Sequence, residues 1–187
     1  MKKSTPFFFL KDIDPTVKEK VFEQDYETKL SIKGVRVVEL NYFVEEDGDF
    51  GEILRITNGE VEGFPGFRIA QVNRTRLNSQ AIKAWHFHVK QHVLWYISPA
   101  FNLFVGLWDI RNNSSTKGNV MRVLLGQGKS TILLIPPGVA HGSANFSQNP
   151  VNLYYFTNCQ FNKRQPDEKR LPWDSLGESF WLPQRDK

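Results

Sequence analysis

The stretch that most constrains the fold is Trp85-His86-Phe87-His88-Val89-Lys90-Gln91-His92. Alternate residues of an extended strand share a face, so the run predicts a strand with two unlike faces. The three histidines would then point one way, toward the inside of a barrel. The apolar residues between them would point the other way, into a packed layer. The run therefore predicts a β-structure that carries polar chemistry in its lumen.

Residues on both sides of this stretch continue the β pattern. Short runs rich in Val, Ile, Phe, Tyr and Trp occur at residues 35–40, 67–72, 84–89, 92–97, 103–110, 121–125, 132–135 and 151–157. Many short strands at close spacing are typical of an all-β sandwich or barrel. No long stretch shows the 3.6-residue apolar repeat of a helix, which argues against a fold of alternating strands and helices.

Length and composition bound the class of protein. The 187 residues predict one domain, and we expect an N-terminal arm over residues 1–31 and a β-domain with a C-terminal tail over residues 32–187. The single cysteine, Cys159, excludes an internal disulfide framework.

Charge and hydropathy bound the partners and the location. The net charge of +4 is scattered along the chain, so we expect no nucleic-acid partner. No apolar run reaches the 18 or so residues of a membrane-spanning helix, so we expect no membrane partner. The apolar run near the N-terminus is too short for an export signal, which predicts a cytoplasmic protein.

All four histidines of the chain fall in two segments. His86, His88 and His92 share the first, and His141 follows a Pro-Pro-Gly turn that is able to aim it back at the barrel. Imidazole suits proton transfer near neutral pH and is also the commonest metal ligand. The residues alone leave three interpretations open: acid–base catalysis, a metal centre, or histidines that only form hydrogen bonds in a polar lumen.

The two histidine segments resemble the paired motifs of the cupin superfamily, His-x-His and Pro136-x-Gly138-x-x-His141-x-x-x-Asn145. Within that superfamily the chain most resembles the dTDP-4-dehydrorhamnose 3,5-epimerase family. Further pieces of the family pattern follow in order at residues 48–54, 71–75, 109–118, 135–142, 153–157 and 167–174. The resemblance implies an all-β cupin jelly roll (a double-stranded β-helix), a homodimer, and no metal or other cofactor. It also implies an epimerase of deoxysugar biosynthesis that inverts C3, C5 or both of a nucleotide-activated 4-keto-6-deoxyhexose.

The resemblance assigns roles residue by residue. His86 matches the general base that removes a proton beside the C4 ketone, and Tyr154 matches the general acid that returns a proton to the opposite face of the enolate. Positions that match the substrate pocket are Glu52, Gln71, Asn73, His141 and Lys83, the last in place of a diphosphate-binding arginine. The family's pocket lysine has no direct counterpart, and His92 or Lys90 lies nearest to its place. Asp47 stands where the family has a second diphosphate-binding arginine, and Asp186 is the candidate carboxylate partner of His86.

Two other functions compete with the epimerase. One is a metal-dependent cupin, because four imidazoles suit a zinc, copper, iron or nickel ion. Its ligands would be His86, His88, His92 and His141. The other is a non-catalytic sugar-binding cupin, which the acidic Asp47 favours.

Overall fold

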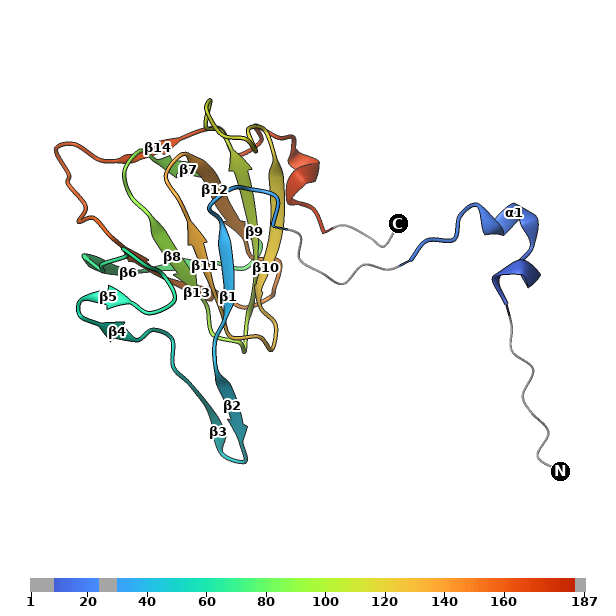
Figure 1. Ribbon diagram of the computed structural model, residues 1–187, viewed down its shortest axis with the longest axis horizontal. Helices are drawn as coiled ribbons and strands as arrows, with labels where there is room; N and C mark the ends of the chain where they lie inside the picture. Colours follow the sequence, from blue (N-terminus) through green and yellow to red (C-terminus); the bar gives the residue numbers. More distant parts are fainter. Residues whose placement is uncertain (1–8, 24–29, 184–187) are drawn as a thin grey trace.

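Two five-stranded sheets facing each other form the body of the molecule (Figure 1). The computed structural model describes residues 9–23 and 30–183. One sheet contains, in spatial order, β1 (Arg36–Glu39), β11 (Thr131–Ile135), β8 (Val93–Tyr96), β13 (Val151–Thr157) and β6 (Gln71–Leu77). The other contains β10 (Val120–Gly126), β9 (Asn102–Asp109), β12 (Val139–Ala144), β7 (Ile82–His88) and β14 (Glu168–Arg170). Neighbouring strands pair antiparallel throughout both sheets. The predicted all-β jelly roll is confirmed.

Smaller elements surround the two sheets. Two hairpins precede β6, formed by β2 (Tyr42–Glu45) with β3 (Gly48–Gly51) and by β4 (Ile56–Thr57) with β5 (Glu60–Val61). The helical turns are η1 (Leu10–Asp12), α1 (Pro15–Lys18) and η2 (Glu178–Trp181). In the part of the chain that is described, no helix has the length and apolar character needed to cross a membrane.

The core explains why the two sheets stay together. Strands at one end of the jelly roll present alternate apolar residues to the space between the sheets, as β10 does with Met121, Val123 and Leu125, all buried. They pack against buried residues of the opposite sheet such as Leu133 and Ile135. One part of this space is hollow, where β6, β8 and β13 face β7, β12 and β14.

The C-terminal tail covers the outer face of β7. Trp85 is fully buried there against Phe180 and Trp181, with ring centroids 5.1 and 4.7 Å away. Close approach of the tail requires a glycine on β9, because a Cβ at Gly106 would lie 2.5 Å from the Phe180 ring. The tail therefore packs back onto the barrel. Its packing fixes β7 with Trp85 outward and the neighbouring histidines inward.

Strand boundaries differ from the prediction in two places. The run 67–72 is mostly loop, and β6 begins only at Gln71, because Phe67 packs with Phe64 and Val61 in a separate apolar cluster. The segment around His141 is a full strand, β12, rather than the turn alone. Small residues such as Ala140, Gly142 and Ser143 lack the usual strand signature, and pairing with β7 and β9 on both sides forms the strand.

A buried ion pair at the end of β9 ties the following loop to the barrel. The fully buried Asp109 carboxylate accepts from Arg111 Nε at 2.8 Å and from the hydroxyls of Ser114 and Thr116 at 2.6 and 2.7 Å. Arg111 also donates to the carbonyl of Lys33 at 2.7 Å. The hydrogen bonds, led by the one from Arg111, hold the pKa of Asp109 well below its ordinary value despite its burial.

We expect Asp109→Asn to lower the free energy of unfolding by about 2–3 kcal/mol at pH 7, since it leaves a largely buried guanidinium without its charge partner. Because the folded-state pKa is depressed, this contribution is present above the ordinary aspartate pKa and is lost as the pH falls through the folded value. Urea unfolding measures it. The control is Glu60→Gln in the exposed Glu60–Arg68 pair, where we expect less than about 1 kcal/mol. Equal losses in the two variants would contradict the account.

Candidate active site

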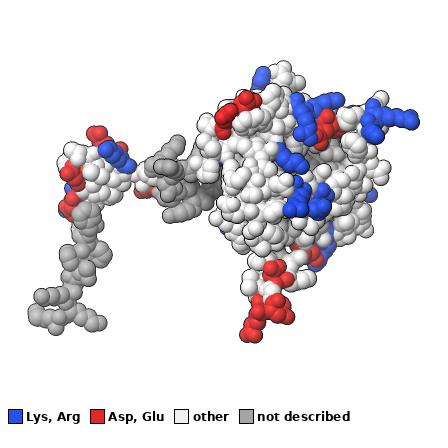
Figure 2. All heavy atoms as spheres, turned by 180° about the vertical axis from the view of Figure 1, so that it is seen from behind, with Lys and Arg blue, Asp and Glu red and all other residues white. Residues whose placement is uncertain are grey.

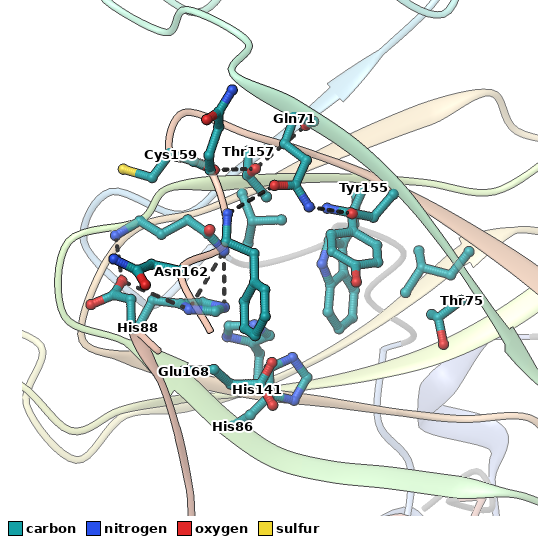
Figure 3. Close-up of a pocket in the computed structure, with 18 of the residues that line it drawn as sticks. Gln71, Thr75, His86, His88, His141, Tyr155, Thr157, Cys159, Asn162 and Glu168 are labelled. Carbon is teal, nitrogen blue, oxygen red and sulfur yellow. Dashed lines mark hydrogen bonds and ion pairs between the residues drawn. The ribbon is translucent and has the colours of Figure 1, made fainter. Parts of the chain in front are cut away.

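A cavity of about 380 Å³ lies between the two sheets. Its walls come from β6, β8 and β13 on one side and from β7, β12 and β14 on the other, and residues 159–167 close one edge. Figure 3 shows side chains from both walls reaching into it. Small-molecule sites of proteins have volumes in this range and combine apolar lining with a few polar groups. The cavity is therefore the candidate active site.

Three histidines meet on the wall formed by β7 and β12 (Figure 3). His86 and His88 alternate along β7 and line the cavity, and His141 lies opposite His86 in the β12–β7 register. The ring centroids of His86 and His141 are 4.2 Å apart, and one ring nitrogen from each of the three lies within 4.8 Å of the others. The two-faced strand predicted from the sequence is confirmed for His86 and His88.

His92 does not belong to this group. β7 ends at His88, and the Asp167 carboxylate accepts the backbone N–H groups of residues 89–91 at 3.2, 3.1 and 2.9 Å. The resulting turn breaks the two-residue alternation. His92 lies instead beside Arg36 and Phe64, at a second cavity of about 230 Å³. The prediction that His92 shares the lumen is wrong, and so is the four-histidine arrangement.

Burial and nearby positive charge favour the neutral form of these imidazoles. Burial, with the charges of His88, Arg170 and Lys83, lowers the pKa of His86 to about 3. Burial also lowers the pKa of His88, against Glu168 and Asp167, and it holds the pKa of His141 well below its ordinary value. His86 is thus unprotonated at neutral pH, the state that a general base requires.

The tyrosine that faces the cavity is Tyr155. Along β13, alternate residues Leu153, Tyr155 and Thr157 line the cavity, whereas Tyr154 is 40% exposed and is not part of the lining. The prediction that Tyr154 faces the lumen is wrong by one residue, since adjacent tyrosines on a strand point to opposite faces. Burial, together with Glu168, raises the pKa of Tyr155, which keeps its hydroxyl protonated. Because β13 and β7 belong to different sheets, Tyr155 and His86 stand on opposing walls.

Three more of the predicted residues reach the same cavity: Gln71, Asn73 and Lys83. Gln71 and Asn73 share the inner face of β6 and are linked by a 2.6 Å hydrogen bond from the Gln71 amide. The side-chain oxygen of Gln71, Oε1, accepts the backbone N–H of Phe161 at 2.8 Å. Lys83 on β7 donates to Thr75 on β6 at 2.8 Å, which joins the two walls at one point. These amide and hydroxyl groups are suited to hold a sugar or nucleotide.

Glu52 does not line the cavity that contains the three histidines. It follows β3 and pairs with Arg55 at 2.7 Å, beside a separate cavity of about 160 Å³. The preceding β2–β3 hairpin projects from the barrel (Figure 1), so its neighbour Glu52 does not reach the histidines. Acidic side chains gather at the tip of this hairpin (Figure 2), which includes Asp47. Asp186 lies outside the described residues.

Sequence reasoning missed the contribution of β14. Glu168 and Arg170 on this short strand pair opposite His88 and His86 on β7, and both line the cavity. Arg170 and Lys83 thus place two positive charges near His86. The acidic tip of the β2–β3 hairpin does not line this cavity. The signature at residues 167–174 marks the segment as part of the family pattern. Its place beside β7 depends on a pairing between residues some 80 positions apart, which no local pattern shows.

Fold and site together define a class of protein. It is a jelly-roll enzyme with a cavity in which the unprotonated imidazole of His86 and the protonated phenol of Tyr155 lie on opposite walls. This arrangement is suited to proton transfer at the two faces of a small ligand. The sequence model described as dTDP-4-dehydrorhamnose 3,5-epimerase matches residues 29–179, and the chain belongs to this family. The chain is thus an enzyme of the nucleotide-sugar epimerase class.

Individual proteins extend this comparison. The chain is 38% identical over 143 residues to the spore coat polysaccharide biosynthesis protein SpsL of Bacillus subtilis (strain 168), a match that covers 76% of this chain and 91% of that one. Its fold is similar to that of a dTDP sugar isomerase from Desulfovibrio desulfuricans G20, with a TM-score of 0.68 and 24% identity over 80% of this chain and 91% of that one. It is also similar to ChmJ, a 3'-monoepimerase from Streptomyces bikiniensis in complex with dTDP-quinovose, with a TM-score of 0.67 and 20% identity over 83% of this chain and 78% of that one.

Proposed function

We propose that the chain inverts C3, C5 or both of a dTDP-linked 4-keto-6-deoxyhexose, with His86 as general base and Tyr155 as general acid. The observation that carries this proposal is the position of the two groups on opposing sheets of one cavity. Inversion requires that a proton leave one face of a carbon and return to the other. A base and an acid on the same wall could exchange a proton but could not invert the centre.

The chemistry follows from the substrate. The C4 ketone acidifies the protons on C3 and C5, and His86 takes one of them while the C–H electron pair moves into the carbonyl to give an enolate. Tyr155 then donates its hydroxyl proton to the opposite face of that carbon, and the electron pair returns from oxygen. The raised pKa of Tyr155 keeps a proton available for this step. Positive charge near the enolate lowers the barrier, and Lys83 and Arg170 supply it.

The same two cations suit the diphosphate of the nucleotide. Lys83 and Arg170 line the cavity, and Arg170 is largely exposed, as expected of a group at its mouth. Charge-assisted hydrogen bonds from such groups to phosphate oxygens are stronger than neutral ones. Gln71, Asn73 and Thr75 then hold the remaining polar groups of the ligand. Diphosphate beside His86 also offsets the charges that lower its pKa, so binding would activate the base.

We also propose that the enzyme is a homodimer located in the cytoplasm and that it serves a pathway of the dTDP-rhamnose type. In this proposal, residues 1–31 form an arm attached to the domain at residues 32–187. Exposed apolar side chains on the projecting β2–β3 hairpin support a partner chain, because Phe43, Val44 and Phe50 are more than half exposed there. A second copy would cover them. Light scattering that finds only monomer at micromolar concentration would contradict the dimer.

Turnover tests the proposed activity. The protein is incubated with a dTDP-4-keto-6-deoxyhexose, and the couplings between ring protons are followed by NMR, because inversion at C3 or C5 changes them. We expect a second set of couplings to grow until the epimers reach equilibrium. Substrate that stays unchanged at high enzyme concentration would contradict the proposal.

A further inference from the structure

The second cavity, beside His92, takes no part in the proposed reaction. It has a volume of about 230 Å³, and neither His86 nor Tyr155 lines it. We propose that this cavity binds a small organic carboxylate, a molecule with one negative charge and an apolar body. Arg36, His92 and Asn158 hold the carboxylate group in this proposal, which does not rest on the proposed activity.

The register of the strands brings these three polar residues to one face of the first sheet. Arg36 of β1 pairs with Leu134 of β11, and Leu134 pairs in turn with Leu94 of β8. Leu94 packs in the apolar cluster on the outer face of this sheet, and His92, two residues before it, takes the same face by alternation. Asn158 lies beside His92, because its Oδ1 accepts the His92 backbone N–H at 2.8 Å. The active cavity lies on the opposite face of the same strands.

Apolar side chains form the rest of the cavity wall. Phe64 and Phe67 come from the segment that follows β5, and both are almost fully buried. The backbone N–H of Phe64 donates to the carbonyl of Val61, and that of Phe67 donates to the carbonyl of Phe64, both at 3.0 Å. These bonds hold the segment over the sheet, so the wall is formed before a ligand arrives. Ligand sites usually combine such a preformed apolar wall with a few polar groups.

The charge of the lining is positive. Arg36 lines the cavity, and no Asp or Glu does. The guanidinium lies 5.2 Å from the centroid of the Phe64 ring, and in the part of the chain that is described it forms no ion pair. A guanidinium that stacks on a ring keeps its N–H edge available, and this edge matches the two oxygens of a carboxylate.

His92 and Asn158 supply two neutral donors. Nδ1 of His92 is buried and has no hydrogen-bond partner among the described residues. A proton there would be a buried donor without an acceptor, which is costly, so the proton belongs on Nε2, the ring nitrogen that remains accessible. Burial lowers the pKa of His92, which keeps the ring neutral at pH 7. Asn158 uses its oxygen for the His92 backbone, which leaves its amide nitrogen available to a ligand.

The number of charges and the space select the class of ligand. One guanidinium and two neutral donors match the single charge and the two oxygens of a carboxylate. A phosphate monoester carries a charge of about −1.5 to −2 near pH 7, and part of that charge would stay unpaired against an apolar wall, which is costly. The cavity has the volume of about seven or eight liquid water molecules. It therefore has room for apolar groups beyond the carboxylate.

Titration with benzoate tests the inference, because benzoate joins a carboxylate to an apolar ring. Backbone amides of the ¹⁵N-labelled full chain are followed by NMR. We expect saturable shifts at His92, Asn158 and residues 64–67, with a dissociation constant of about 1 mM for so small a probe. Benzamide, which lacks the charge, should bind at least about tenfold more weakly. Thymidine diphosphate should leave the benzoate shifts in place, since the two cavities lie on opposite faces of the sheet.

Two variants remove the recognition in different ways, and each should weaken benzoate binding by at least about tenfold. Arg36→Gln removes the charge. Asn158→Asp keeps the oxygen that accepts the His92 backbone N–H but replaces the amide donor with a negative oxygen. The matched control is Arg76→Gln, because Arg76 is an exposed arginine of β6 in the same sheet and lines neither cavity. The control should bind benzoate as wild type does, and circular dichroism checks that all three variants are folded.

Several results would overturn the inference. They are equal binding of benzamide and benzoate, wild-type affinity in either Arg36→Gln or Asn158→Asp, and an equal loss in Arg76→Gln. Benzoate shifts that lie around His86 and disappear with thymidine diphosphate would place the probe in the active cavity instead. Inorganic phosphate that shifts the amides of His92 and Asn158 where benzoate does not would contradict the assignment to a carboxylate.

Discussion

Tyr155→Phe is expected to lower the rate of inversion by about 10²–10⁴-fold, the range that a positioned general acid contributes. The ring remains, so the wall of the cavity and the β13 packing should be preserved. Proton abstraction by His86 does not use the Tyr155 hydroxyl. Solvent exchange at the carbon beside the ketone should therefore fall much less than product formation. NMR measures both quantities in one experiment with the dTDP-4-keto-6-deoxyhexose in deuterated buffer.

Tyr154→Phe is the matched control for this prediction. The two variants remove the same hydroxyl from adjacent residues, but only Tyr155 lines the cavity. We expect Tyr154→Phe to retain the wild-type rate of inversion within about twofold, because exposed substitutions away from a site have small effects. If the Tyr154 variant lost inversion and the Tyr155 variant kept it, the assignment of the acid would be wrong.

His86→Asn is expected to reduce both exchange and inversion by at least about 10²-fold, because no other group then takes the proton. Asparagine is similar in size and polar, so the variant should still fold and bind thymidine diphosphate through Lys83 and Arg170. Binding is measured by calorimetry and exchange by NMR, and His92→Asn serves as the control from outside the cavity. If exchange in His86→Asn matched wild type, His86 would not be the base, and the neighbouring His141 or His88 would take its place.

The sequence pattern together with the family resemblance predicts the fold and most of the site. Period-two runs and turn residues predict an all-β sandwich or barrel, and the family resemblance narrows this to the jelly roll. Alternation along β7 correctly places His86 and His88 inward. The pocket positions Gln71 and Asn73 come from the family resemblance, and in the structure they share the inner face of β6. These features depend on residues within one strand, where local geometry decides which face a side chain takes.

The errors arise where non-local contacts decide. Either member of the Tyr154-Tyr155 pair satisfies the pattern of β13, and only pairing with β8 and β6 selects Tyr155. In an uninterrupted strand, His92 would share a face with His86 and His88. Asp167 instead holds a turn over residues 89–91, and this turn separates His92 from β7. Arg170 reaches the site because its strand, β14, lies near the end of the chain and pairs with β7. The two-residue alternation within a strand does not show which distant strand lies beside it, and the pairing of β14 with β7 joins residues some 80 positions apart.

Solvent deuterium uptake by wild-type enzyme is the most direct test of the central claim, that this cavity removes and returns a proton beside a ketone. The protein is mixed in deuterated buffer, with chelator, with a dTDP-4-keto-6-deoxyhexose, and the C3 and C5 proton signals are followed by NMR. The account predicts that one or both signals disappear faster than in an enzyme-free control and that the inverted sugar formed carries deuterium at that carbon. A chain that binds the nucleotide sugar yet leaves both protons in place would contradict the account, and the cavity would then be a binding site without catalysis.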